Sequence, residues 1–195
     1  KSSEQLFKTI RGYGLICFNG AVIYENSRII WCRSISYSDA CNVLVSLDRF
    51  MPEKRWAISC FEKTYVNYSN SQYRRVYANT ELPNDNPLKI TVRNVNVTEY
   101  KNIKEIFQEK LHTNLLKNGN MLITHLEAQK KNALSFVLNK NHISPQNVVA
   151  FGNDINDIGF MVQAHYSIAV NNADEEVKSK ARYICLSNDS DGVAY

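Results

Sequence analysis

The sequence predicts an α/β fold in which an α+β module interrupts a doubly wound core. From Glu127 to the end of the chain, helical and extended patterns alternate, as they do in a doubly wound sheet. Between Arg55 and Arg93, by contrast, short pieces rich in aromatic and β-branched residues are separated by Asn, Ser and Pro. The two ends therefore predict one kind of domain and the middle another. Ligands of such cores bind beyond the carboxyl ends of the strands.

The N-terminal part begins with a predicted helix over residues 2–11, which carries Leu6, Phe7 and Ile10 on one face. The chain starts inside this pattern without a methionine, so we expect further residues upstream. An apolar run over 14–18 predicts a strand buried on both faces of a parallel sheet. Asn19-Gly20 then predicts a turn. The next predicted elements are extended segments over 21–24 and 28–32 and a helix over 38–50.

The remaining elements follow from periodicity and capping signals. Thr98 lies near the start of an amphipathic helix predicted over 97–111, and a strand is predicted over 120–124. Asn172 and Glu175 form an N-cap and capping-box signature for the helix that follows them. The elements predicted after residue 127 are helices over 128–141, 157–164 and 173–181 and strands over 147–151, 167–170 and 183–186.

Composition restricts the function classes. The chain has 195 residues and a net charge of +4, but its basic residues are scattered and the longest basic runs are pairs, such as Arg74-Arg75. Nucleic-acid binding needs a clustered basic stripe, so that class rests on mild basicity alone. No apolar run approaches the length of a membrane span and no signal-peptide pattern is present, which predicts a cytoplasmic protein without a membrane partner. Five widely spaced cysteines predict free thiols.

A loop dense in side-chain oxygens follows the predicted strand at 147–151. It reads Asn153-Asp154-Ile155-Asn156-Asp157. Amide and carboxylate oxygens suit Mg²⁺, which takes one or two protein carboxylates and fills its other positions with water and phosphate. The alternative is that these residues only cap the next helix, but a cap requires one such residue rather than four in five positions. The loop therefore predicts a Mg²⁺ site.

Segment 152–157 resembles the fourth motif of the haloacid dehalogenase superfamily, which reads Gly-Asp-x-x-Asn-Asp in its Cof-like branch. Lys130-Lys131-Asn132-Ala133-Leu134 resembles the third motif, a lysine that opens a helix; Lys130 is the better match and Lys131 the alternative. Residues 168–194 follow the closing pattern of the branch. Residues 16–21 resemble the point where the core strand leads into a large cap. The resemblance covers nearly the whole chain.

The resemblance implies a Rossmann-like three-layer core, incomplete at its N-terminus, built from residues 1–21 and 124–195. An α+β cap domain would occupy 22–123. It also implies a Mg²⁺-dependent phosphatase that hydrolyses a small phosphorylated metabolite, such as a sugar phosphate, through an aspartyl-phosphate. Lys130 would contact the phosphate and the nucleophile. The metal residues would be Asn153, Asp154 and Asp157, the last acting through water, and the other phosphate-binding residues would be Asn156, Asn19 and Asn172.

Two departures from the family pattern affect this expectation. The Asp-x-Asp nucleophile motif and the Ser/Thr motif that follows it belong upstream of Lys1, so the chain as given is expected to be inactive. Asn153 stands where the family has a ligating aspartate, which lowers the expected Mg²⁺ affinity unless Asp154 or Asp157 replaces it. The alternative is therefore a non-catalytic relative with a binding or regulatory role. The sequence does not predict the oligomeric state.

Overall fold

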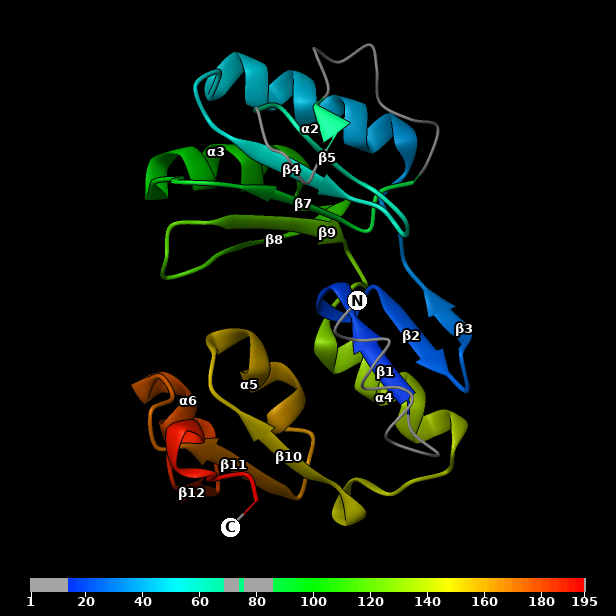
Figure 1. Ribbon diagram of the computed structural model, residues 1–195, viewed down its shortest axis with the longest axis vertical. Helices are drawn as coiled ribbons and strands as arrows, with labels where there is room; N and C mark the ends of the chain where they lie inside the picture. The colour runs from blue at the N-terminus through cyan, green and yellow to red at the C-terminus, as the bar shows by residue number, and fades with distance from the viewer. Residues whose placement is uncertain (1–13, 69–73, 76–85, 195) are drawn as a thin grey trace. The chain divides into compact units, whose positions relative to one another are not determined.

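The computed structural model describes residues 14–68, 74–75 and 86–194 (Figure 1). The chain divides into two compact units, residues 1–128 and 129–195, and each is described by itself. The helix predicted over residues 2–11 lies outside the described residues.

The first unit begins with a small antiparallel sheet in the order β1-β2-β3. Its strands are β1 (Gly14–Cys17), β2 (Val22–Glu25) and β3 (Arg28–Cys32). The expectation of a parallel strand buried on both faces at 14–18 is wrong, because β1 alternates exposed and half-buried residues. The reason is the turn at Phe18–Gly20, where Asn19 and Gly20 have φ of 60° and 101° and turn the chain back along β1. The Asn19-Gly20 turn itself is confirmed.

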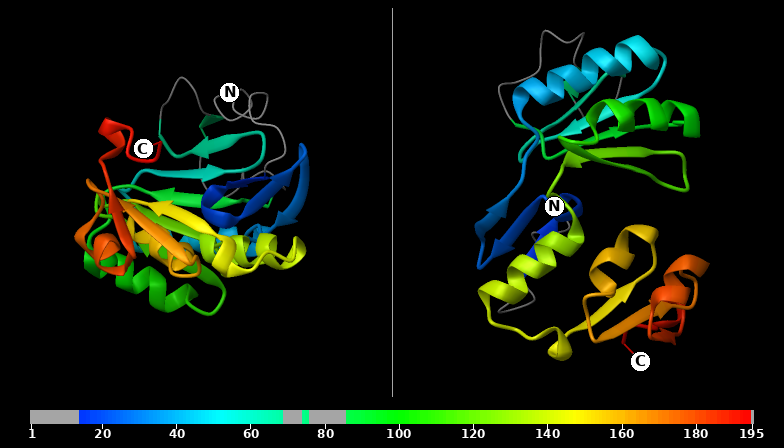
Figure 2. Two further views of the ribbon diagram at one scale, coloured as in Figure 1. Left: turned by 90° about the horizontal axis from the view of Figure 1, so that it is seen from below. Right: turned by 180° about the vertical axis from the view of Figure 1, so that it is seen from behind.

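A six-stranded sheet in the order β6-β5-β4-β7-β9-β8 forms the rest of the first unit. All its pairs are antiparallel except β5 with β6. Helices α2 (Tyr37–Phe50) and α3 (Val97–Phe107) pack on one face of it (Figures 1 and 2). Its strands are β4 (Trp56–Ser59), β5 (Thr64–Val66), β6 (Arg74–Arg75), β7 (Lys89–Val92), β8 (Leu111–Leu115) and β9 (Met121–His125).

The helices of this unit form where capping and apolar spacing agree. Ser36 caps α2 by accepting a hydrogen bond from the Asp39 N–H, and the helix buries Ala40, Val43, Leu44 and Leu47 at three- and four-residue spacing. This stripe packs on alternate residues of the central strands, and each large apolar side chain buried there stabilises the fold by about 1.5–3 kcal/mol.

Helix α3 is capped by Asn96 and Glu99 and ends at Phe107, four residues before its predicted end. Leu111 instead begins β8, which the sequence analysis missed, and pairs with His125. Leu111 is 2% exposed, so burial against the sheet overrides its helical periodicity.

The second unit has the alternation predicted for a doubly wound core. Its parallel sheet has the order β10-β11-β12, with strands Val149–Gly152, Tyr166–Val170 and Tyr183–Cys185. Its helices are α4 (Lys130–Lys140), α5 (Ile155–Met161) and α6 (Glu175–Lys180), and short 3₁₀ turns span Pro145–Asn147 and Asn188–Ser190. The predicted capping role of Asn172 is wrong: the N-cap of α6 is Asp174. The Asn172 side chain is hydrogen-bonded to Asn188 instead.

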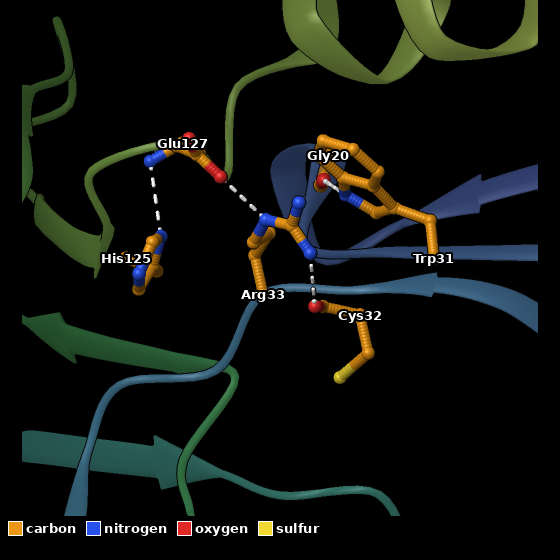
Figure 3. Close-up of polar contacts among 6 residues, drawn as sticks. All are labelled: Gly20, Trp31, Cys32, Arg33, His125 and Glu127. Carbon is orange, nitrogen blue, oxygen red and sulfur yellow. Dashed lines mark hydrogen bonds and ion pairs between the residues drawn. The ribbon is translucent and has the colours of Figure 1, made fainter.

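The predicted boundaries of an inserted cap, 22–123, stay a prediction. Strands β2 and β3 pair with β1 and not with the large sheet, which together with its helices spans residues 37–125. The chain enters the large sheet and its helices after β3 and leaves them after β9, and a small polar cluster joins these two crossings (Figure 3).

At these crossings Arg33 Nε lies 2.5 Å from Glu127 Oε2, and the Arg33 guanidinium lies 3.8 Å from the centre of the Trp31 ring. Trp31 Nε1 donates to the Gly20 carbonyl at 3.1 Å, and the Glu127 N–H donates to His125 Nδ1 at 3.1 Å (Figure 3). The cluster therefore fastens the segments that lead into and out of the large sheet.

The longest described helix, α2, has 14 residues. Within the described part of the chain, no helix has the length and apolar character needed to cross a bilayer.

Candidate functional site

The loops after β10 and β11 lie next to each other, because both follow the carboxyl ends of neighbouring parallel strands. The first contains Asn153 to Asp157 and the second contains Asn171 to Asp174. The Asp174 N–H donates a hydrogen bond of 3.1 Å to the Asn153 carbonyl, which ties the two loops together. This edge of the sheet is where the sequence predicted the functional residues.

Asp157 lies in the first turn of α5, and the contacts of the first loop converge on it. It is 5% exposed, and its Oδ1 lies 2.5 Å from Lys130 Nζ. Its Oδ2 accepts hydrogen bonds from the N–H groups of Asn153 at 3.0 Å and Asp154 at 3.2 Å. Buried carboxylates require such partners, and here both oxygens have them. The contact that joins Lys130 to the loop is therefore also the contact that compensates a buried charge.

Lys130 opens helix α4, a position that disfavours a cation because the helix dipole places partial positive charge there. The first turn of α4 contains no acidic residue, so within this unit the compensating charge comes from Asp157 of another element. Lys131 lies differently: its stem is within 3.5 Å of the position that a Cβ on Gly159 would occupy. Of the two lysines that matched the motif, Lys130 is the one that the structure brings to the loop.

Gly152 makes room for this arrangement, a role that the sequence analysis did not assign. A Cβ at this residue would lie 2.8 Å from the Asp157 Cβ and 2.2 Å from the Met161 Sδ. Real side chains do not approach so closely, so only glycine lets the Asp157 carboxylate fold back over the end of β10. The sequence did contain a signal for this role, a glycine directly after an apolar run. Periodicity alone, however, does not distinguish a glycine needed for close packing from the glycine of an ordinary turn.

Asp154 and Asn156 lie half-buried at the start of α5, where one caps the other's backbone. Asp154 is the N-cap of α5, and its Oδ1 accepts a hydrogen bond of 3.3 Å from the Asn156 N–H. The capping interpretation therefore holds for Asp154, and Asp157 completes the same capping box. Capping does not account for Asn153, whose side chain is exposed beside them.

The oxygens of this loop fit Mg²⁺ in chemical type. Asn153 and Asp154 offer an amide oxygen and a carboxylate oxygen, both hard donors, whereas the two oxygens of Asp157 are already engaged. Among the described residues, no three or more His, Cys, Asp and Glu side chains are grouped to hold a metal. Mg²⁺ takes only one or two protein carboxylates, and Asp154 offers one beside the Asn153 amide.

The two remaining asparagines lie in different units. The Asn172 side chain donates to Asn188 Oδ1, and the Asn188 N–H donates back to Asn172 Oδ1 at 3.3 Å. This pair ties the loop after β11 to the C-terminal turn, where a Cβ on Gly192 would lie 1.9 Å from the Leu186 carbonyl oxygen. Asn19 belongs to the first unit, at φ 60° in the turn after β1.

Comparison with known proteins supports the arrangement of these elements. A phosphoglycolate phosphatase from Methanobrevibacter smithii is 27% identical over 140 residues, which cover 68% of this chain and 60% of that protein. The sugar phosphatase BT4131, described as a member of subclass IIB of the superfamily, shares the fold with a TM-score of 0.82 at 18% identity over 99% of this chain and 76% of its own. SMU.1108c from Streptococcus mutans has a TM-score of 0.78 at 24% identity, covering 90% and 71% of the two chains.

The family comparison covers the whole sequence and confirms the resemblance drawn from the motifs. The chain spans 60% of the length of the Methanobrevibacter smithii relative. The model of the haloacid dehalogenase-like hydrolases matches residues 1–195, and the chain therefore belongs to that family.

Proposed function

We propose that this chain is the larger part of a cytoplasmic, Mg²⁺-dependent phosphatase, a phosphoric monoester hydrolase acting on a small phosphorylated metabolite such as a sugar phosphate. The observation that carries the proposal is the contact of 2.5 Å between Lys130 and Asp157 at the carboxyl end of β10. Family membership supports a hydrolase, and the names of two relatives, a phosphoglycolate phosphatase and a sugar phosphatase, support phosphate esters as substrates.

Lys130 would bind the phosphate. An ammonium group has three N–H donors, and Asp157 Oδ1 uses one of them. The Lys130 side chain is 37% exposed, so the other two donors are open to an incoming phosphate oxygen. Asp157 would hold the Lys130 ammonium beside the loop and partly offset the charge of that ammonium. Asp157 would therefore affect the substrate only through Lys130. Asn156, Asn172 and Asn19 remain proposed phosphate-binding residues.

Asn153 and Asp154 would hold the Mg²⁺, with Asp157 supporting it through water. A bound Mg²⁺ ion neutralises charge on a phosphoryl group during its transfer. The exposed Asn153 amide presents a neutral oxygen where the family has a carboxylate, so we expect weaker metal binding than in relatives that carry the aspartate.

The nucleophile would be an aspartate in a segment N-terminal to Lys1. The test compares the 195-residue chain with the protein extended through its upstream codons, using a panel of sugar phosphates and Mg²⁺. We expect hydrolysis by the extended protein alone and a fall of about 10²-fold or more in kcat when Lys130 is changed to Gln. The adjacent substitution Lys131→Gln, on the same helical turn, is the control. An upstream segment without Asp-x-Asp, or equal rates for the two variants, would refute the proposal.

A non-catalytic binding or regulatory role is the second candidate, and the Asn153 amide is the observation that favours it. The substitution Asn153→Asp restores the carboxylate and should tighten Mg²⁺ binding about tenfold, about 1.4 kcal/mol, as measured by calorimetry with inorganic phosphate present. The control is Asn147→Asp, which adds the same charge before the amino end of β10, away from the loop. No Mg²⁺ binding at millimolar concentration by the extended protein or by its Asn153→Asp variant would favour the second candidate.

A further inference from the structure

The first unit has a polar groove on its large sheet, with a cavity volume of about 670 Å³. It contains no residue of the Lys130 loop. Its lining carries three cations and one carboxylate, accompanied by amides and one hydroxyl. The lining residues are Glu53, Lys54, Arg55, Thr91, Arg93, Asn94 and Asn120.

Arg55 and Arg93 lie directly opposite each other on neighbouring strands. Trp56 pairs with Val92 in the antiparallel register of β4 and β7, so Arg55 and Arg93 form the next pair outward. The Arg93 N–H donates to the Arg55 carbonyl at 2.9 Å. Since Trp56 and Val92 point into the core beneath the helices, the alternation of strands places both arginines on the opposite, helix-free face.

This pairing is unfavourable by itself, because like charges directly opposite each other on paired strands repel. Both arginines are exposed, and the ion pairs formed by described residues include neither of them. Their guanidinium groups instead share one aromatic ring, at 5.6 Å and 5.4 Å from the centre of Tyr68. A cation–π contact offsets part of the repulsion but leaves the positive charges uncompensated.

Lys54, the third cation of the groove, has its charge paired. Its Nζ donates to the Asn94 carbonyl and lies 3.1 Å from Glu99 Oε2, which fixes the wall of the groove. The acidic residue of the lining, Glu53, is exposed. The free cations of the groove are therefore the two guanidinium groups.

We propose that the groove binds a small phosphate-bearing anion between Arg55 and Arg93. Guanidinium groups offer forked donors that match phosphate oxygens, and the Asn120 amide and Thr91 hydroxyl supply neutral donors beside them. The groove is confined to the ends of three strands, and it suits a compact anion rather than a nucleic-acid backbone, which needs an extended track. The groove shares no residue with the proposed catalytic loop, and the proposed anion binding does not rest on the Mg²⁺ proposal.

The test is a calorimetric titration of the chain with sodium pyrophosphate at low salt and without divalent metal. We expect Arg55→Gln and Arg93→Gln each to weaken binding at least tenfold. The control Arg49→Gln should stay within twofold of the wild type, because it removes an exposed arginine that also lies over an aromatic ring, Phe50 at 5.2 Å, but outside the groove. Lys130→Gln removes a cation of the other unit and shows whether the anion binds there instead.

Thermal unfolding of the same variants gives an independent measurement. Pyrophosphate should raise the melting temperature of the wild type, and Arg93→Gln should abolish this rise without lowering the melting temperature in its absence, because it removes a repulsion. Undiminished binding by both groove variants refutes the site, and loss of binding in Lys130→Gln alone assigns the anion to the other unit. Tighter binding of a single-stranded oligonucleotide than of pyrophosphate would refute the small-anion class.

Discussion

Replacing Lys130 with Met tests the contact on which the candidate site depends. The substitution keeps much of the aliphatic stem and removes the ammonium, which faces Asp157 and lies 5.7 Å from the centre of the Phe160 ring. Asp157 is 5% exposed and would keep only its two backbone donors. A buried carboxylate that loses its cation is costly, because its hydration is not restored.

The separation of the two groups sets the size of the effect. Coulomb's law at 2.5 Å gives about 1.7 kcal/mol with the dielectric constant of water and about 6.6 kcal/mol with an effective constant of about 20. Lys130 is 37% exposed, so solvent screening and the desolvation of both groups reduce the net value. We expect Lys130→Met to lower the free energy of unfolding of the second unit by about 2 kcal/mol.

The assay must report on the second unit, and both tryptophans, Trp31 and Trp56, belong to the first. Amide hydrogen exchange of helices α4 and α5 therefore measures the effect, while tryptophan fluorescence follows the other unit as an internal control. Lys131→Met on the same turn should cost less than about 0.5 kcal/mol. Equal protection in the two variants, or no coupling between Lys130→Met and Asp157→Asn in a double-mutant cycle, would refute the reasoning.

Three further predictions follow from other contacts. Gly152→Ala should lower the free energy of unfolding by about 1–3 kcal/mol, because the new Cβ would overlap Asp157. The control Gly159→Ala has ordinary contacts within a helix and should be neutral or stabilising. Chemical denaturation that destabilised both variants would contradict this. Burial raises the pKa of the Cys17 thiol above its ordinary 9.0, so the stability that the neutral thiol contributes is complete below that pH and is lost as pH rises through the folded-state pKa. Between about pH 8 and about pH 10 the free energy of unfolding should therefore fall less steeply with pH in Cys17→Ala than in the wild type, and an unchanged slope would contradict the assignment. Arg33→Gln should cost about 1 kcal/mol, since the Glu127 pair is partly exposed, and should change tryptophan emission; unaltered emission would argue against the stacked guanidinium.

Several features of the fold were predictable because local signals and tertiary contacts agree. Helix α2 combines the Ser36 cap with a stripe from Ala40 to Leu47, and both are visible in the sequence. The alternation after residue 127 was equally clear, since the strands of the second unit are short and apolar and the first two are each followed by a helix. In the candidate site, the dense run from Asn153 to Asp157 marked the loop before any contact was known.

Other features depend on contacts between distant residues. Leu111 continues a helical period, yet it begins β8 because pairing with His125 buries it. Asn172 has the spacing of a capping box, yet its amide bonds to Asn188, sixteen residues away. Adjacent lysines at 130 and 131 match the same motif position, and only the packing of α4 against α5 assigns one to Asp157 and the other to Gly159.

The sequence by itself determined the family, the α/β class and the position of the oxygen-rich loop, because these depend on residue types at short spacing. The tertiary structure alone decided that Asp157 is buried, that Lys130 neutralises it and that Gly152 leaves room for it. It also decided that Arg55 and Arg93, thirty-eight positions apart, lie side by side over Tyr68. Spacing along a chain gives local geometry. Whether a charge is buried, and whether an opposite charge lies beside it, depends on which strands and helices pack together.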